Sequence, residues 1–359
     1  MRRLVLDMKD RRPVWAMPEW VPLELAAALP AEWALTVIDD ATDGSGDGAA
    51  RVSPRVLEAV RDAEIYLGYG VPAELLESGS HLAWVHSGAA GVGSSLTEAM
   101  RARDVIFTNS AGVHAPPIAE TVLAMILHFL RGLDLAAPAQ RRGVWSTAAF
   151  YSEAAPVVEL SNATVGIVGF GGIGREVARR VASLGARVVA SKRTTPTRVD
   201  EADLEPVAGG GALGGRIELV HGPEGLDALL AAGDVVVLAV PETEETRGLI
   251  DARALGLMRP GAVLVNVARG RVVVEDALVD ALASGRLRGA GLDVFEREPL
   301  PEGHPLWAME HVVVTPHVSA VTRGFWRREA DLILRNLERY LTGAPIEAWE
   351  NVVDKAAGY

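Results

Sequence analysis

Three charged residues late in the chain have side chains that could act together on a small carbonyl compound. Arg269 and His317 directly follow apolar runs typical of strands, and Glu298 comes just beyond another such run. A cation can hold an anionic substrate and polarise its carbonyl, an imidazole can exchange a proton with the carbonyl oxygen, and a carboxylate can favour the charged imidazole. Each residue alone is more often solvated in a loop, but three strand ends on one sheet edge favour a shared site.

A glycine-rich turn earlier in the chain indicates which cofactor such a site would use. The run GFGGIG follows the apolar strand pattern TVGIVG and opens the helical pattern REVARRVASLG. Glycines at this spacing allow a tight turn and bring the backbone close to a pyrophosphate at a helix N-terminus. We therefore predict a dinucleotide site rather than an incidental turn. Its residues are Gly169, Gly171, Gly172, Ile173 and Gly174.

The strand after this turn predicts which dinucleotide is preferred. In sites that bind NAD, an acidic residue about 20 residues beyond the glycines binds the adenosine ribose and would repel a 2′-phosphate. Here Lys192 stands eighteen residues after Gly174, and no carboxylate follows before Asp200. We expect NADP(H) to be preferred and NAD(H) to be usable, the simpler alternative being a solvated basic pair at a strand end. The residues expected to bind the phosphate are Ser191, Lys192, Arg193 and Thr194.

Two series of short apolar runs, alternating with helical patterns, must position these residues. Such alternation is typical of βαβ units, so the predicted fold class is α/β with two doubly wound parallel sheets. A cofactor domain over 113–319 is predicted to be inserted in a substrate domain over 1–112, which a helical pattern within 320–359 completes. A long apolar helix near 115–133 is followed by a polar stretch to about Ser161, and the glycine-rich run 208–215 predicts a surface loop.

Composition and charge narrow the classes of protein. The chain has 359 residues, of which 49% are hydrophobic, so a disordered protein is excluded and two domains with buried cores are expected. Its formal net charge of −12 is spread along the chain, which argues against nucleic acid as a partner. The absence of cysteine excludes thiolate catalysis and disulfides. Asp7 and Lys9 interrupt the N-terminal apolar stretch, and we expect a cytoplasmic protein that contacts no membrane and needs no metal.

Several long segments resemble the D-isomer-specific 2-hydroxyacid dehydrogenase family, in particular its glyoxylate/hydroxypyruvate reductases. The segments cover nearly the whole chain and include HSGAAGVG, TNSAGVHAPPIAETVLAMIL, VGIVGFGGIGREVARR, MRPGAVLVNVARGRVVVEDAL, LDVFEREPLPEGHPLW and VVVTPHVSA. The resemblance implies a Rossmann cofactor domain inserted in a flavodoxin-like substrate domain. It also implies hydride transfer between NAD(P)H and a small 2-oxo acid or D-2-hydroxy acid.

The resemblance further implies roles for individual residues. The family's catalytic arginine falls on Arg269, its glutamate on Glu298 and its acid–base histidine on His317. Its substrate-carboxylate loop falls on Ala90 and Gly91, whose backbone N–H groups would act. The cofactor contacts that it adds are Val240, Pro241, Ala268 and Asp293, the last near the nicotinamide amide.

Other functions on the same architecture remain as alternatives. They are a phosphoglycerate dehydrogenase-like activity and a cofactor-sensing corepressor or scaffold. Formate dehydrogenases, as the resemblance implies, have glutamine where Glu298 stands, and adenosylhomocysteine hydrolases need a cysteine that this chain lacks. Gly93 stands in place of the usual aspartate and Thr121 in place of a frequent histidine, so the subgroup within the family stays open. Loops of the first domain near Trp15, Tyr69 and Ala90 are expected to select the acid.

The chain is predicted to form a homodimer. The apolar helix PPIAETVLAMILHFL and the following AAPAQRRGVW, with Trp145, exceed what is needed to cover one parallel sheet. The family that the chain resembles typically dimerises through this region. The alternative is that the helix forms ordinary core between the domains.

Overall fold

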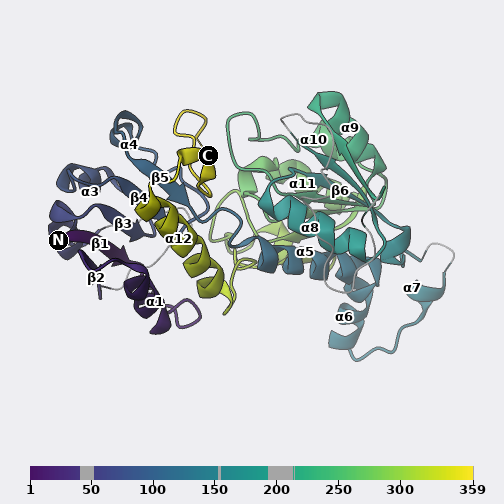
Figure 1. Cartoon of the computed structure of the whole chain (residues 1–359). Coiled ribbons are helices and arrows are strands. Elements are labelled where there is room, and N and C mark those ends of the chain that lie inside the picture. Colours follow the sequence, from purple (N-terminus) through teal and green to yellow (C-terminus); the bar gives the residue numbers. More distant parts are fainter. Residues whose placement is uncertain (41–51, 153–154, 193–212, 214, 359) are drawn as a thin grey trace. The chain divides into compact units, whose positions relative to one another are not determined.

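The computed structural model of the chain consists of two compact units. It describes residues 1–40, 52–152, 155–192, 213 and 215–358. Unit 1 comprises Met1–His114 and Val321–Tyr359, and unit 2 comprises Ala115–Ala320. These boundaries lie within two residues of the domain boundaries expected from the sequence. Each unit is built on one parallel sheet with helices on both faces (Figure 1).

The sheet of unit 1 has five parallel strands in the order β2-β1-β3-β4-β5. The strands are β1 (Arg2–Asp7), β2 (Trp33–Val37), β3 (Ile65–Gly68), β4 (Trp84–Ser87) and β5 (Ile106–Asn109). Every residue of β3 and β4 is buried, as expected for parallel strands covered on both faces. The strand order is that of flavodoxin-like folds, which the family resemblance implied for this domain.

Helices cover both faces of the unit 1 sheet. The helices α1 (Trp20–Ala28) and α12 (Phe325–Thr342) pack on one face, in a core that includes Leu6, Trp84 and Ile333. The other face is covered by α2 (Pro54–Ala59), α3 (Ala73–Ser78) and α4 (Glu98–Ala102), around Val85 and Phe107. Because α12 follows the last strand of unit 2, unit 1 is discontinuous in sequence.

The sheet of unit 2 has seven parallel strands in the order β12-β11-β10-β9-β6-β7-β8. The strands are β6 (Thr164–Val168), β7 (Arg187–Ser191), β8 (Ile217–Val220), β9 (Val235–Leu238), β10 (Ala262–Asn266), β11 (Leu287–Leu292) and β12 (Val312–Val314). The strand order reverses between β6 and β9, and open α/β sheets bind ligands at the carboxyl ends beside such a switch point. The predicted fold class is confirmed.

Helices also cover both faces of the unit 2 sheet. On one face α5 (Ala115–Leu130) and α8 (Gly172–Ser183) pack against β6, β7, β9 and β10, in a core that includes Met125, Ile167 and Val181. On the other face lie α9 (Gly222–Ala232), α10 (Ala252–Leu257) and α11 (Glu275–Ala283), with Leu230 and Leu264 in their core.

The sequence predicted a polar stretch after α5 and assigned no helix to it. It contains two helices, α6 (Leu133–Arg141) and α7 (Ala148–Tyr151). The structure buries only Asp134, Pro138 and Ala139 of α6 and no residue of α7, so neither helix has the apolar stripe from which a helix is predicted. The predicted glycine-rich loop at 208–215 lies almost wholly outside the described residues.

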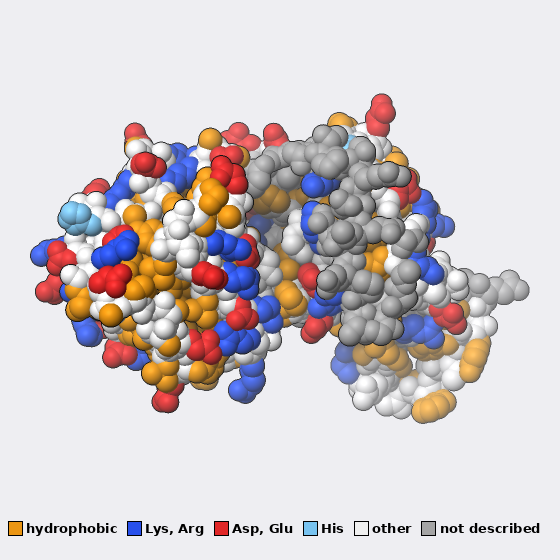
Figure 2. All heavy atoms as spheres, viewed as in Figure 1, with side chains coloured by type: hydrophobic (Ala, Val, Ile, Leu, Met, Phe, Trp, Pro, Cys, Tyr) orange, Lys and Arg blue, Asp and Glu red, His pale blue; other side chains and the backbone are white. Residues whose placement is uncertain are grey.

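The helices of the described residues are short for a membrane span. Within the described residues, no single helix is long and apolar enough to cross a membrane, and α5 and α6 reach that length only as a pair bent by 76°. On the face that Figure 2 shows, Lys and Arg side chains of unit 1 are mixed with Asp and Glu. Unit 1 contains ion pairs between partly exposed side chains, such as Arg327–Glu24 and Arg335–Glu350.

Candidate active site

The carboxyl ends of the unit 2 strands bring together the predicted cofactor and catalytic residues that the structure describes. Glu298 lies in the loop after β11, between Asp293 and β12. The strand-end residues are Gly169 after β6, Ser191 at the end of β7, Val240 and Pro241 after β9, Ala268 and Arg269 after β10, Asp293 after β11 and His317 after β12. The glycine turn and the catalytic candidates therefore lie on opposite sides of the switch point.

His317 and Glu298 form a hydrogen-bonded pair. Nδ1 of His317 lies 2.8 Å from Oε2 of Glu298, and Oε1 of Glu298 accepts the backbone N–H of Phe295 at 3.0 Å. The side chains of His317 and Glu298 are 42% and 36% exposed. Because a carboxylate can only accept, Nδ1 carries the proton in this pair. The other ring nitrogen, Nε2, is therefore the one that can meet a substrate.

Arg269 lies in a turn that the neighbouring residues fix. The side-chain amide of Asn266 donates to the carbonyl of Arg269 at 3.1 Å, and its oxygen accepts the N–H of Ala268 at 3.0 Å. Nη1 of Arg269 donates to the carbonyl of Ala268 at 2.8 Å. Gly270 comes so close to the loop after β11 that an added Cβ would lie 1.8 Å from the carbonyl carbon of Phe295. The Arg269 turn thus packs against the loop that carries the predicted glutamate.

The glycine turn after β6 has the shape that a pyrophosphate needs. Gly169 has a φ of 101°, and an added Cβ at Gly174 would lie 2.0 Å from the carbonyl oxygen of Gly169. At Gly171, the N-cap of α8, no side chain caps the helix and an added Cβ would meet no described atom within 4 Å. Gly171 and Gly172 are exposed, and the first N–H groups of a helix have no partner within the helix, so they can bind an anion. The turn fits the diphosphate of a dinucleotide.

Two of the residues expected to select the cofactor lie at the carboxyl end of β7: Ser191 is its last residue, and Lys192 follows it. The N–H of Gly169 donates to both the carbonyl and the hydroxyl oxygen of Ser191, at 3.2 and 3.3 Å. Nδ1 of His221, the residue after β8, donates to the carbonyl of Lys192 at 2.8 Å. His221, which the sequence analysis missed, thereby helps to fix the backbone at Lys192. The predicted residues Arg193 and Thr194 lie outside the described residues.

In unit 1, Ala90 and Gly91 lie in the loop after β4. The side-chain amide of Asn109 donates to the carbonyl of Ala90 at 2.8 Å, and the N–H of Ser110 donates to the carbonyl of Ala89 at 3.3 Å. The backbone N–H groups of Ala90 and Gly91 donate to no acceptor among the described residues. Two donors in an anchored loop can bind a carboxylate.

A buried polar network links this loop to the C-terminal helix. Nε2 of His86, on β4, lies 2.9 Å from Oε1 of Glu329, on α12, and Nδ1 lies 2.9 Å from the hydroxyl of Thr108, on β5. The hydroxyl of Ser110 donates to the same oxygen of Glu329 at 2.9 Å. All four side chains are buried. Sequence reasoning missed Glu329 because a charged residue on an amphipathic helix is usually solvated.

Tyr69 and His114 flank the same loop of unit 1. Burial raises the pKa of the Tyr69 hydroxyl well above its ordinary value, and the charges of Asp10 and Glu329 raise it further. Burial lowers the pKa of the His114 imidazole, although the carboxylate of Glu329 opposes that shift. Both side chains are therefore neutral near pH 7.

Comparison with known proteins shows the family. The family model of the D-isomer specific 2-hydroxyacid dehydrogenase, NAD binding domain, matches residues 123–210 and 215–319. The chain belongs to this dehydrogenase family. The matched residues include the glycine turn and all three of Arg269, Glu298 and His317. The sequence resemblance to D-2-hydroxyacid dehydrogenases is confirmed.

Relatives with different named activities are similar to this chain. D-3-phosphoglycerate dehydrogenase of Mycobacterium tuberculosis (strain ATCC 25618 / H37Rv) is 36% identical over 272 residues, which are 75% of this chain but only 47% of the relative. Glyoxylate reductase of Thermococcus onnurineus is 34% identical over 296 residues, or 80% of this chain and 83% of the relative. The chain thus spans about half the length of the mycobacterial relative.

A solved structure extends the similarity to the whole chain. The NADPH-dependent glyoxylate/hydroxypyruvate reductase of Sinorhizobium meliloti, in complex with NADP and sulfate, is similar with a TM-score of 0.75 and 28% identity. The similarity covers 100% of both chains. Both units of this chain therefore have counterparts in a reductase that was solved with NADP.

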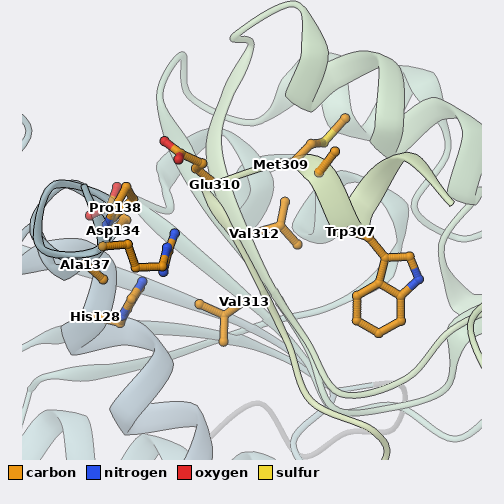
Figure 3. A pocket seen from close by; sticks show the side chains of 11 residues that line it. His128, Asp134, Ala137, Pro138, Trp307, Met309, Glu310, Val312 and Val313 are labelled. Atoms are coloured by element: carbon orange, nitrogen blue, oxygen red, sulfur yellow. The ribbon is translucent and has the colours of Figure 1, made fainter. Parts of the chain in front are cut away.

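A separate pocket in unit 2 has none of the predicted site residues in its lining. Its volume is about 300 Å³, and residues of α5, α6, the short 3-10 helix Pro305–Ala308 and β12 line it. In Figure 3, His128, Asp134 and Pro138 lie on one side of the pocket and Trp307 on the other. Because β12 is an edge strand, this pocket lies at one edge of the unit 2 sheet.

Proposed function

We propose that this protein reduces small 2-oxo acids with NADPH, as a glyoxylate/hydroxypyruvate-type member of its family. The observation that carries the proposal is the pair of His317 and Glu298, joined at 2.8 Å on the sheet edge that also holds Arg269 and the glycine turn. A cation, an acid–base group and a dinucleotide turn are the parts that carbonyl reduction needs. The named activities of the Thermococcus relative and the Sinorhizobium structure support this substrate class.

The binding steps are assigned to backbone donors and one cation. The glycine turn and the N-terminus of α8 would hold the pyrophosphate, and Val240, Pro241 and Ala268 would line the same edge. When bound, the reduced nicotinamide supplies the hydride. Arg269 would bind the substrate carboxylate and offset the negative charge that grows on the carbonyl oxygen. In unit 1, the family resemblance assigns substrate binding to the N–H groups of Ala90 and Gly91.

His317 is assigned the proton transfer. Its Nδ1–H donates to Glu298, so Nε2–H would give its proton to the carbonyl oxygen as the alcohol forms. Glu298 would hold the ring in this orientation and stabilise the imidazolium before the proton leaves. In the oxidative direction Nε2 would accept the hydroxyl proton of the 2-hydroxy acid.

A substrate panel tests the proposed activity. Purified protein is assayed with glyoxylate, hydroxypyruvate, pyruvate and phenylpyruvate, each with NADPH and NADH, by the loss of nicotinamide absorbance. We expect the highest kcat/KM with glyoxylate or hydroxypyruvate. If no acid is reduced while NADPH still binds, the proposal is wrong and the cofactor-sensing corepressor becomes the better account.

Phosphoglycerate dehydrogenase-like activity is the second candidate, because of the 36% identity with the mycobacterial enzyme. The same panel distinguishes it when 3-phosphoglycerate and NAD are added. A kcat/KM for 3-phosphoglycerate oxidation above those of the short acids would favour this candidate.

We propose further that NADPH is preferred to NADH. Lys192 at the end of β7, with no carboxylate near it in sequence, and the NADP in the Sinorhizobium structure support this preference. The test is kcat/KM with each cofactor, in the wild type and in the double variant Lys192→Asp with Arg193→Ala. We expect the variant to lose about 10-fold or more of its preference for NADPH, since charge-assisted hydrogen bonds would be replaced by repulsion. A wild type that prefers NADH, or a preference that does not change, would contradict the proposal.

We also propose that the protein is a homodimer. The segment after α5 exposes several large apolar side chains, and Trp307 beside the pocket of Figure 3 is 55% exposed. The exposed fractions are 50% for Leu133, 53% for Val144, 96% for Trp145 and 85% for Tyr151. Monomers seldom expose so many large apolar groups in one segment. Cytoplasmic location stays a prediction from the sequence.

A further inference from the structure

Asp293, the first residue after β11, is turned toward the loop that carries His317. It is 1% exposed, and its backbone carbonyl accepts the N–H of His317 at 2.9 Å. Its Oδ1 accepts the hydroxyl of Thr315 at 2.6 Å and the N–H of Val318 at 2.9 Å. Its Oδ2 accepts the N–H of Ser319 at 3.0 Å and also the hydroxyl of Ser319. One carboxylate thus binds the chain on both sides of His317.

The backbone of His317 needs such support. Its φ of 54° lies in the left-handed region, which residues other than glycine rarely adopt. A residue in such a conformation keeps it only when its surroundings hold it there, and such residues cluster at functional sites. The bonds from Thr315, Val318 and Ser319 to one carboxylate provide that hold.

We propose that Asp293 is a positioning residue, which keeps His317 in the left-handed conformation that lets Nδ1 meet Glu298. The proposal rests on the proposed function, because it takes His317 as the acid–base group. It goes beyond the cofactor contact that the resemblance implies for Asp293. Asp293 itself transfers no proton in this account.

The hydrogen-bond count explains why a carboxylate is needed at this position. An ionised carboxylate has about four lone-pair sites, and four donors reach it from Thr315, Val318 and Ser319. In an asparagine, one of the two oxygens is replaced by an NH2 group, which is itself a donor. This NH2 group would face other donors of the loop, and some N–H or O–H groups would be buried without an acceptor. Asp293→Asn should therefore release the loop even though the side chain keeps its size.

The test compares two variants that break the hydrogen bonds between Asp293 and the His317 loop, one at the acceptor and one at the donors. Asp293→Asn removes the acceptor, whereas Thr315→Val with Ser319→Ala removes two donors and leaves Asp293 unchanged. We expect kcat to fall about 10- to 100-fold in the first and about 3- to 10-fold in the second, since small displacements of a catalytic group have effects of this size. The Kd of NADPH should stay within about 2-fold of the wild type in the donor variant. Asp251→Asn, which alters the N-cap of α10 in the same unit, serves as the control.

A readout independent of turnover separates this proposal from the proposed function. The proton on Nδ1 of His317 is followed by nuclear magnetic resonance, and we expect its downfield signal to shift or vanish in both loosened forms and to persist in Asp251→Asn. If the wild type reduces no 2-oxo acid but the signal responds in this way, the proposed function fails and the positioning of His317 stands. An unchanged signal in Asp293→Asn would overturn the positioning role. A second result would also overturn the positioning role: a wild-type kcat in Thr315→Val with Ser319→Ala, together with weaker NADPH binding in Asp293→Asn. Asp293 would then act on the cofactor alone.

Discussion

His317 combines a ring that solvent reaches with a backbone that the protein holds. Its side chain is 42% exposed and Nδ1 meets Glu298, while its N–H donates to the carbonyls of Asp293 and Thr315. A general acid needs both properties, because it must reach the substrate and must present one nitrogen in a fixed direction.

Replacing His317 by alanine should lower kcat by about two to four orders of magnitude, the usual contribution of acid–base catalysis. The Kd of NADPH should change little, because the glycine turn is on β6 and His317 follows β12. Steady-state kinetics and cofactor titration measure the two quantities. The control is His311→Ala, at the opposite end of β12. Wild-type turnover in His317→Ala would remove this residue from the reaction.

Replacing Arg269 by alanine should raise KM and lower kcat together. The same cation is assigned to the substrate carboxylate and to the charge that develops on the carbonyl oxygen, so it acts in both the ground state and the transition state. We expect kcat/KM to fall about 100-fold or more, as for the loss of a charge-assisted hydrogen bond. Arg271→Ala, two residues further on with an exposed side chain, is the matched control. An unchanged kcat and KM in Arg269→Ala would exclude this cation from the site.

Residue type and strand-end position were sufficient to propose Arg269, Glu298 and His317 from the sequence, because parallel strands bring their carboxyl ends to one edge. The hydrogen bonds of Asp293 could not be predicted in this way. They depend on the left-handed φ of His317, which leaves no periodic signal in the sequence. His221 was missed for a similar reason, since its contact with Lys192 joins two strand ends that lie far apart in the chain.

At the scale of elements, β1 ends in a buried carboxyl group that makes unit 1 sensitive to pH. Oδ2 of Asp7 accepts the hydroxyl of Tyr66 at 2.9 Å, and burial raises the pKa of Asp7 to about 6. The folded state therefore binds this proton more tightly than the unfolded state. The stability that protonated Asp7 contributes to the folded state is fully present below about pH 4, and it is lost as the pH rises through about 6.

Asp7→Asn should remove this pH dependence, because an amide does not ionise. Relative to the wild type, the free energy of unfolding of the variant should rise by about 2 kcal/mol between about pH 4 and pH 7, as a pKa shift of this size implies. Chemical denaturation at several pH values measures it, with the exposed Asp62→Asn as control. A difference between variant and wild type that is the same at every pH would contradict this assignment.

Strands were the best predicted elements of the fold. Runs rich in valine and isoleucine alternate with helical patterns, and the structure has five and seven parallel strands where two such series were predicted. The helices α6 and α7 were missed because almost none of their residues face a core, so no apolar period marks them. If a second chain or a ligand contacts these helices, that contact leaves no apolar period that can be recognised in a single sequence.

At the scale of the whole molecule, the exposed apolar segment after α5 predicts a dimer. Light scattering at micromolar concentration should give a mass near twice the 38.0 kDa of one chain. Trp145→Ser with Tyr151→Ser should shift the mass toward one chain, because both side chains are exposed and their loss removes apolar area from the proposed interface. Leu23→Ser in unit 1, also exposed, is the control. A mass near 38.0 kDa for the wild type would contradict the dimer.

Deuterium on the cofactor shows whether this protein transfers the nicotinamide hydride to C2 of a 2-oxo acid. The protein is incubated with hydroxypyruvate and NADPH that carries deuterium at the transferred position of the nicotinamide, and the product is examined by nuclear magnetic resonance and chiral chromatography. The account predicts D-glycerate with deuterium on C2, formed by the wild type and about two to four orders of magnitude more slowly by His317→Ala. Recovery of unchanged hydroxypyruvate, or of a product without deuterium on C2, would contradict it.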